Sequence, residues 1–555
     1  MNKKVCSFPI LFALLALLIG TCAVVFPASA QAAPTSTGSI TVGGTVASGY
    51  DAYQIFSANV VDGDNGAKTA TDLAWANDAA RDAVLPVLHS AGMPKSQTTA
   101  QEAAEWLNTD SHLTSALSAQ LARSLQSSGS VFVALNAGTA AELPCGYWLI
   151  VADDAIAQGE AGTAPIMALV GGGAVTVKPK AATPKVAKHV LEDGTAAWQK
   201  AADATVADDL YWRLSATVPA GLTAYDTYTV RFVDTMSAGL DPSKVAASMR
   251  VYVAAGADGG FDAVSAGKDG RAGTDPAKGW TDITAQCATK VAADGKTFTV
   301  RTGDLIAALG GTEAFTAGAR VVAVYNAPLN SACNHGIAKG NPNEVYLRYP
   351  RSPLADQSGD IGFTRTPSDD ACAYTWDLAL TKRGSDGDKP LAGAVLSIAD
   401  DRGRTLAADG TWDAEGKATV TTGEDGRVTV SGVDSGKLEV RELKAPKGYT
   451  AFEGTRSVTV KAEGLDVDQV AAAKPKLTIT AESPLRADSA DGSTGSLEAS
   501  LINTPTGTPP SITTGGFMPS TGDMAMYAAA AAAVAGAALI VVALLVKRGG
   551  GSHKE

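Results

Sequence analysis

The chain has 555 residues, a formal net charge of −12 and five histidines. The acidic balance argues against binding to nucleic acid or to anionic lipid surfaces, because both are themselves negatively charged. The histidines are scattered, no His/Cys group has the spacing of a zinc site, and no Gly-x-Ser-x-Gly motif occurs. We therefore expect neither a metalloenzyme nor a hydrolase, and we expect no cofactor and no metal.

The first 30 residues have the three parts of a secretory signal peptide. Two lysines precede an apolar run over 9–26, and a box of small residues ends at Ala30. These are the features that direct export and cleavage, so we expect cleavage after Ala30, with Ala32 or Ala33 as alternatives. The competing interpretation is an uncleaved membrane anchor. Export permits disulfides, and four cysteines allow three pairings that the sequence does not distinguish: Cys145, Cys287, Cys333 and Cys372.

The other end of the chain carries a short motif, an apolar stretch and a basic tail. The stretch over 526–546 is long enough to form a transmembrane helix. Two basic residues follow it directly, which places the tail 547–555 on the cytoplasmic side. A Thr/Pro/Gly-rich linker, 506–517, precedes the motif and would let it extend as a peptide.

This order resembles the sorting signal of sortase substrates, whose pentapeptide is usually Leu-Pro-any-Thr-Gly. The corresponding residues are Met518, Pro519, Ser520, Thr521 and Gly522, with methionine in place of leucine. The resemblance implies that a sortase cleaves between Thr521 and Gly522 and transfers the Thr521 carbonyl to an amine. The competing interpretation is a plain membrane anchor preceded by a chance Pro-Ser-Thr-Gly.

Between the two ends there is room for about three domains. Residues 34–177 are expected to form a mixed α/β domain, with strand-like alternation over 49–56 and two or three helices over 70–126. Residues 186–352 and 373–505 both have the short alternating segments and Gly/Asp turns of all-β domains.

In these two later domains, several predicted strands have apolar residues at alternate positions, and a polar residue takes the next alternate position at one end of the series. Side chains two apart on a strand share one face, so each of these polar residues should point inward with its apolar neighbours. In each domain a lysine lies in the first strand, an acid lies near the middle and an asparagine lies near the end. The six residues are Lys188, Asp234 and Asn343 in the second domain and Lys382, Glu442 and Asn503 in the third.

The repeated order predicts a chemical reaction between these side chains. Burial favours the neutral form of a lysine and the protonated form of a carboxyl. A neutral amine is a nucleophile, and a protonated acid beside it can polarise the asparagine amide and pass protons to the departing ammonia. We therefore predict spontaneous Lys–Asn isopeptide bonds, with Asp234 and Glu442 as the catalytic acids. The competing interpretation is a buried ion pair in each domain or a different strand register.

Several short segments of the two later domains match known families. In the third domain they are Pro-Leu-Ala-Gly-Ala at 390–394, residues 438–449 and residues 503–505, and in the second domain they are residues 188–190, 232–240 and 343–347. Through these segments the third domain resembles Cna protein B-type domains, with 438–449 in the place of the pilin E-box and Leu443 where Thr is usual. The second domain is similar to the isopeptide-forming D2 domain of fimbrial shaft proteins. These resemblances imply tandem immunoglobulin-like β-sandwiches.

A degenerate pilin motif occupies the linker 178–185. Val177-Lys178-Pro179-Lys180 stands where the family has Val-Tyr-Pro-Lys, which makes Lys180 the expected acceptor of the Thr521 acyl group. In an extended segment, successive side chains point to opposite sides, so Lys178 and Lys180 should lie on the same side of the chain. The competing interpretation is that these are ordinary lysines of an interdomain linker.

The chain as a whole resembles the sortase-assembled major pilins of Gram-positive bacteria. The resemblance implies a secreted pilus shaft subunit that is joined head-to-tail to other copies of itself, anchored to peptidoglycan after transient membrane anchoring, and supports adhesion. Sortase, minor pilins and a host surface ligand are the implied partners. The alternative is a wall-anchored monomeric adhesin or a minor pilin, and Lys180 is the feature that discriminates between them.

Overall fold

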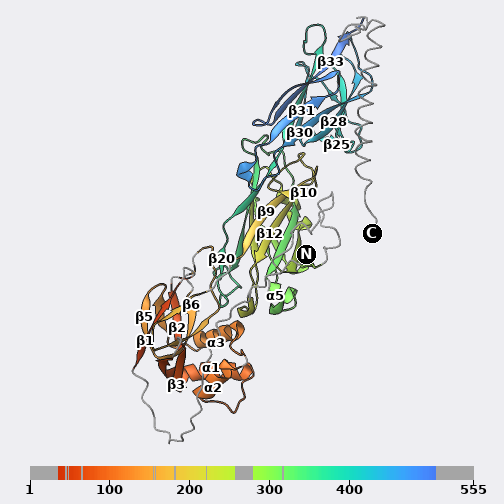
Figure 1. The fold of residues 1–555 in the computed structure, drawn as a ribbon. Coiled ribbons are helices and arrows are strands. Elements are labelled where there is room, and N and C mark those ends of the chain that lie inside the picture. The colour runs from red at the N-terminus through yellow and green to blue at the C-terminus, as the bar shows by residue number, and fades with distance from the viewer. Residues whose placement is uncertain are drawn as a thin grey trace, which may run out of the picture.

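The computed structural model describes residues 36–507, except for gaps at 44–46, 48, 64–66, 110, 154–155, 157, 180–182, 221, 257–278 and 316–317. The expected signal peptide, sorting motif and apolar segment lie outside the described residues. Among the residues that are described, no helix is long and apolar enough to span a membrane. Three domains follow one another along an elongated molecule, with the first and third at opposite ends (Figure 1).

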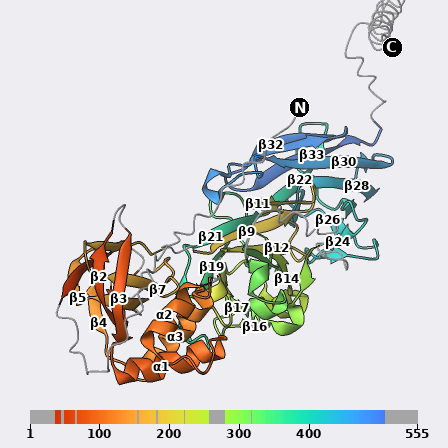
Figure 2. The same cartoon turned by 60° about the horizontal axis from the view of Figure 1, so that its bottom comes forward.

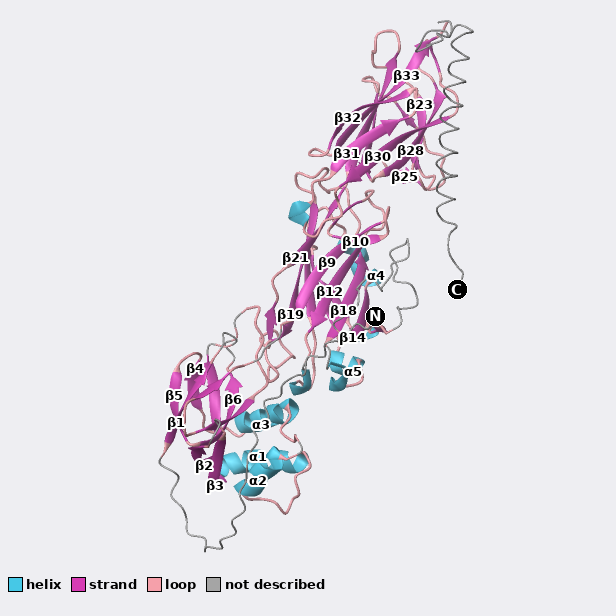
Figure 3. Cartoon of the chain, in the orientation of Figure 1, coloured by secondary structure: helices cyan, strands magenta, loops and turns pink. Residues whose placement is uncertain are grey.

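The first domain combines two sheets with three helices, which cover the larger sheet (Figure 3). Each helix begins at a residue whose side chain accepts a backbone hydrogen bond, and Thr99 and Glu102 complete a capping box on the second. Residues 68–75 form a strand instead of the start of a helix, because they pair with β2. The elements are β1 (Thr37–Val42), β2 (Gly49–Asp62), β3 (Lys68–Trp75), α1 (Asp78–Ser90), α2 (Ala100–Asn108), α3 (Ser115–Ser127), β4 (Val133–Asn136), β5 (Ala140–Pro144), β6 (Gly146–Ala152), β7 (Ile166–Val170) and β8 (Val175–Val177).

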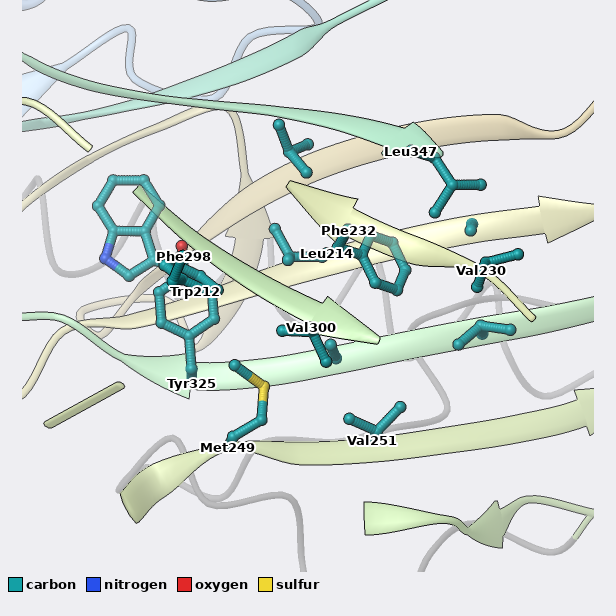
Figure 4. Close-up of a cluster of buried hydrophobic side chains, with 14 of the residues drawn as sticks. Trp212, Leu214, Val230, Phe232, Met249, Val251, Phe298, Val300, Tyr325 and Leu347 are labelled. Atoms are coloured by element: carbon teal, nitrogen blue, oxygen red, sulfur yellow. The ribbon is translucent and has the colours of Figure 1, made fainter. Parts of the chain in front are cut away.

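The second domain packs a six-stranded sheet, β10-β9-β12-β18-β14-β15, against a seven-stranded sheet, β11-β21-β19-β13-β17-β16 with β20 beside β19. Aromatic and branched side chains from both sheets fill the space between them (Figure 4). The strands are β9 (Lys185–Glu192), β10 (Ala197–Gln199), β11 (Ala201–Asp203), β12 (Tyr211–Val218), β13 (Arg231–Met236), β14 (Arg250–Ala255), β15 (Thr281–Asp282), β16 (Ala288–Val291), β17 (Thr297–Arg301), β18 (Ala319–Asn326), β19 (Asn341–Pro350), β20 (Phe363–Arg365) and β21 (Asp369–Tyr374), with short helices α4 (Val245–Ser248) and α5 (Leu305–Ala308).

The third domain also consists of two sheets, β27-β22-β33-β29 with β32 beside β33, and β25-β24-β23-β28-β30-β31 with β26 beside β23. Its first and last strands, β22 and β33, are parallel neighbours. The strands are β22 (Trp376–Gly384), β23 (Val395–Ala399), β24 (Thr405–Leu406), β25 (Trp412–Asp413), β26 (Val420–Thr421), β27 (Arg427–Val433), β28 (Gly436–Lys444), β29 (Tyr449–Thr450), β30 (Thr455–Glu463), β31 (Lys476–Ala481), β32 (Leu485–Asp491) and β33 (Ser496–Pro505).

The mainly β fold with a mixed first domain agrees with the expectation from sequence. One boundary differs, because the sheet of the second domain continues past residue 352 through β20 and β21 to Tyr374. The third domain then starts almost at once, with β22 at Trp376. The domains contact each other directly, because α3 lies against the second domain (Figure 2). Arg123 on this helix forms a 2.9 Å ion pair with Asp226.

Candidate isopeptide sites in the second and third domains

The structure brings the six sequence-predicted residues together as two separate groups, one in each later domain. All six side chains are buried, and the two lysines have no exposed surface. Their inward orientation follows from strand alternation, since most of the apolar residues two positions away on the same strands are buried as well, whereas Val186 is half-buried.

The second-domain group lies between the two sheets. Lys188 comes from β9, whereas Asp234 and Asn343 come from β13 and β19, which are neighbours in the facing sheet. The Lys188 ammonium donates a hydrogen bond to Asp234 Oδ2. The lysine backbone is held as well, because its N–H donates to Asp369 Oδ2 at 2.7 Å.

Tyr325 connects the three members of this group and was missed in the sequence. Its hydroxyl accepts from Lys188 Nζ at 2.9 Å and from Asn343 Nδ2 at 2.8 Å, and it donates to Asp234 Oδ2 at 3.1 Å. The tyrosine lies on β18, beside Trp212 and Phe298 in the core (Figure 4). Tyr325 follows Val321 and Ala323 at alternate positions of the same strand, and all three are buried. A polar group at the end of an apolar alternation is the pattern that identified the other residues, so the sequence contained the information needed to predict Tyr325.

Burial shifts both ionisable members toward their neutral forms. Desolvation lowers the pKa of Lys188 to about 8, against the opposing effect of the Asp234 charge. Desolvation also raises the pKa of Asp234. Oδ1 of Asp234 and Oδ1 of Asn343 are both buried without a hydrogen-bond partner among the described residues. A buried acceptor of this kind costs about 1–3 kcal/mol.

The third-domain group has a different arrangement of strands. Lys382 on β22 and Asn503 on β33 come from neighbouring parallel strands, and Glu442 lies on β28 of the facing sheet. The Lys382 ammonium donates to Asn503 Oδ1 and lies 3.1 Å from Glu442 Oε1. The asparagine Nδ2 donates to both carboxylate oxygens of Glu442, at 2.9 and 3.0 Å.

The environment of Lys382 favours a nucleophilic amine. Desolvation lowers its pKa to about 8, although the Glu442 charge acts in the opposite direction. The glutamate is fixed in place by the Phe452 N–H, which donates to Oε2 at 3.1 Å. In the third-domain group an amine, an acid and a primary amide therefore contact one another away from water, and in the second-domain group the Tyr325 hydroxyl bridges the three. Holding the reacting groups together in this way favours amide exchange.

The residues predicted to link one chain to the next are only partly described. The segment between β8 and β9 connects the sheet of the first domain to that of the second, and it contains Lys178, which is exposed. Lys180 and the sorting motif lie outside the described residues. The four cysteines in the described part of the chain are free thiols.

Comparisons with known proteins agree with this architecture. Residues 377–474 match the family described as the SpaA prealbumin-like fold domain. A segment of 143 residues is 30% identical to the trypsin-resistant surface T6 protein of Streptococcus pyogenes and covers 24% of each protein. The aligned part thus spans about a quarter of that relative.

Solved structures of backbone pilins are similar over more of the chain. The T6 backbone pilin of Streptococcus pyogenes matches at 16% identity with a TM-score of 0.45, covering 85% of this chain and 98% of the pilin. The major pilin SpaD of Corynebacterium diphtheriae matches at 15% identity with a TM-score of 0.41, covering 85% and 98%. Residues 377–474 are thus similar to the SpaA prealbumin-like fold domain, and the chain is similar to a streptococcal surface protein and to solved backbone pilins of Gram-positive bacteria.

Proposed function

We propose that this chain is the shaft subunit of a covalent pilus and that each of its two later domains is closed by a self-formed Lys–Asn isopeptide bond. The observation that carries the proposal is the pair of buried groups in two domains of different strand arrangement. In each group a lysine amine contacts an acid, and an asparagine amide contacts the amine directly in the third domain and through the Tyr325 hydroxyl in the second. Two buried ion pairs alone would add little to the stability of the fold, because the desolvation of the charges offsets most of the attraction between them.

The bond would form in the second domain by attack of Lys188 Nζ on Cγ of Asn343. The ammonium first passes a proton to Asp234, and the neutral amine adds to the amide. The Cγ–Nδ2 bond then breaks, and Nδ2 leaves as ammonia. Of the three protons on the ammonium, one remains on the new amide, one leaves with ammonia and one stays on the carboxyl. Tyr325 contacts both Asp234 and Nδ2, so it is placed to pass the proton between them.

In the third domain the same reaction would join Lys382 to Asn503, with Glu442 as the acid. Here the carboxyl itself contacts the departing nitrogen, so no relay is needed. The bond would link the first strand of the domain to the last, a placement suited to a shaft that is pulled along its length.

The assembly proposed for the chain is head-to-tail. After export, a sortase would cleave at Thr521 and join its carbonyl to Lys180 of another copy, and the last subunit would be anchored to peptidoglycan. The described chain ends beyond β33, at the far end of the molecule from the first domain (Figure 1). The proposed acceptor belongs instead to the segment between the first and second domains, so the linkage joins two different parts of the subunit, and a contact of this kind that does not close on itself builds a filament.

The intact mass of the folded, secreted protein tests the internal bonds. We expect it to be lower than the mass of the processed sequence by two ammonia molecules, or roughly 17 Da for each amine attack on an amide. Peptide mapping should recover Lys188 joined to Asn343 and Lys382 joined to Asn503. An unchanged mass would exclude both bonds, and a loss of one ammonia would exclude one of the two groups.

The Tyr325→Phe variant tests the relay. We expect the bond of the second domain to form roughly ten- to a hundred-fold more slowly, since positioned proton transfer contributes at least this much. The bond of the third domain should form at the normal rate in the same molecule. Mass spectra taken at increasing times after synthesis measure both rates. Tyr228→Phe, at another buried tyrosine of this core, is the matched control, and an equal delay in both variants would contradict the relay.

A further inference from the structure

A cysteine, a histidine and an aspartate lie in line where the second and third domains meet. Cys333 Sγ lies 3.5 Å from His335 Nε2, and the other ring nitrogen, Nδ1, lies 2.8 Å from Asp377 Oδ1. This is the order in which a thiol nucleophile, a base and an orienting carboxylate are placed when a cysteine is activated. All three residues are partly exposed to solvent.

The two halves of this group come from different domains. Cys333 and His335 lie in the loop between β18 and β19, whereas Asp377 lies on β22 of the third domain. Backbone hydrogen bonds hold the loop against that domain, from Ile337 N to Gly492 O at 3.2 Å and from Ala338 N to Ser493 O at 3.3 Å. The group is therefore complete only when the two domains are docked.

The carboxylate is itself fixed and keeps the imidazole charged. Asp377 Oδ1 accepts from Ser431 Oγ at 2.6 Å and from Gly432 N at 3.0 Å. The titratable groups that act on His335 are Asp377 and Cys333, and Asp377 has the larger effect; together they raise the pKa of His335 to about 10. The ring is thus an imidazolium at neutral pH, and this cation lies 3.5 Å from the sulfur of Cys333.

We propose that Cys333 is an activated thiol that reacts with low-molecular-weight disulfides, with His335 and Asp377 as positioning residues. The thiolate attacks one sulfur of the disulfide, the new bond joins Sγ to that sulfur, and the other half leaves as a thiolate. One disulfide is exchanged for another, so no further oxidant is needed. The product is a surface-modified subunit carrying one small thiol at the joint between its second and third domains.

The other cysteines provide internal controls in the same molecule. Cys287 is also half-buried, but burial raises its pKa to about 11, so it should react slowly. Cys145 and Cys372 are buried and should stay unmodified while the first and second domains are folded. Their protection therefore reports on folding in every variant.

The test is the rate of modification of each cysteine in the full-length chain by glutathione disulfide or 4,4′-dithiodipyridine between pH 5.5 and 8.5. Reactions are quenched with acid, and modified peptides are counted by mass spectrometry. We expect Cys333 to react faster than Cys287 and to lose little of its rate as the pH falls to 6. In the His335→Gln variant, Cys333 should react as an ordinary thiol with a pKa of about 8.5. Its modification rate should then fall about ten-fold for each pH unit below that pKa.

At pH 6 the variant should therefore be slower than the natural chain by roughly ten-fold or more, after allowing for the lower nucleophilicity of an acidic thiol. Two results would overturn the proposal. One is a Cys333 rate in the natural chain that already falls with pH as an ordinary thiol does. The other is the same rate in both proteins while Cys145 and Cys372 stay protected.

Discussion

The Glu442→Ala variant is expected to lose the isopeptide bond of the third domain and to keep the bond of the second. Its measured mass should therefore be lower than the mass of its own processed sequence by one ammonia molecule instead of two. The reason is that the carboxyl is the acid that contacts both the amine of Lys382 and the departing nitrogen of Asn503. Without it, the amide is not polarised and its nitrogen has no proton donor. Intact mass spectrometry of the folded protein reads the outcome directly.

The same variant should also lose stability. The joined residues are 121 positions apart in sequence, and on the chain-entropy model used for disulfides a cross-link of this span contributes about 5 kcal/mol. Thermal unfolding followed by calorimetry should show an earlier transition for the third domain. The bond in the second domain, still present, would show that the remainder of the molecule folded.

Glu439→Ala is the matched control, because Glu439 lies on the same strand with its side chain half exposed. It should lose both ammonia molecules, as the natural chain does. Asp234→Ala is the reciprocal variant and should lose only the bond of the second domain. A full mass loss in either acid variant would mean that the acid is dispensable.

Replacing Lys180 by alanine is expected to remove the ladder of SDS-resistant oligomers from cell-wall extracts, leaving wall-anchored monomer that contains both internal bonds. The residue follows Pro179, which restricts the backbone and removes a donor. It belongs to the segment between β8 and β9, where the chain passes from one domain to the next. A sortase carrying the Thr521 acyl group needs an accessible amine, and this is the lysine at the position that the pilin motif predicts.

Lys178→Ala is the control for this experiment, since Lys178 is exposed two positions away and is expected to be dispensable. Immunoblots of both variants against the natural chain separate the outcomes. A ladder lost only in Lys178→Ala would assign the linkage to that residue. Ladders retained in both would contradict the pilin motif and favour the monomeric adhesin or minor pilin.

Much of the two candidate sites could be predicted from the sequence, because the alternation of side chains along a strand is a local property. A lysine, an acid or an asparagine in an apolar row must face the core, whatever sheet the strand joins. The same alternation, with the turn residues between strands, predicted that the two later domains are all-β. It also predicted that Asp234 and Glu442 face inward, without reference to any contact.

The order of strands was decided only by the tertiary structure, because pairing between distant segments depends on how all the strands pack together. Alternation alone does not say that β22 and β33 are parallel neighbours, or that β20 and β21 extend the second domain to Tyr374. It does not bring the hydroxyl of Tyr325 from β18 to the amine of Lys188. Asp377 lies beside His335 because the second and third domains dock against each other. No local pattern in the sequence predicts this contact.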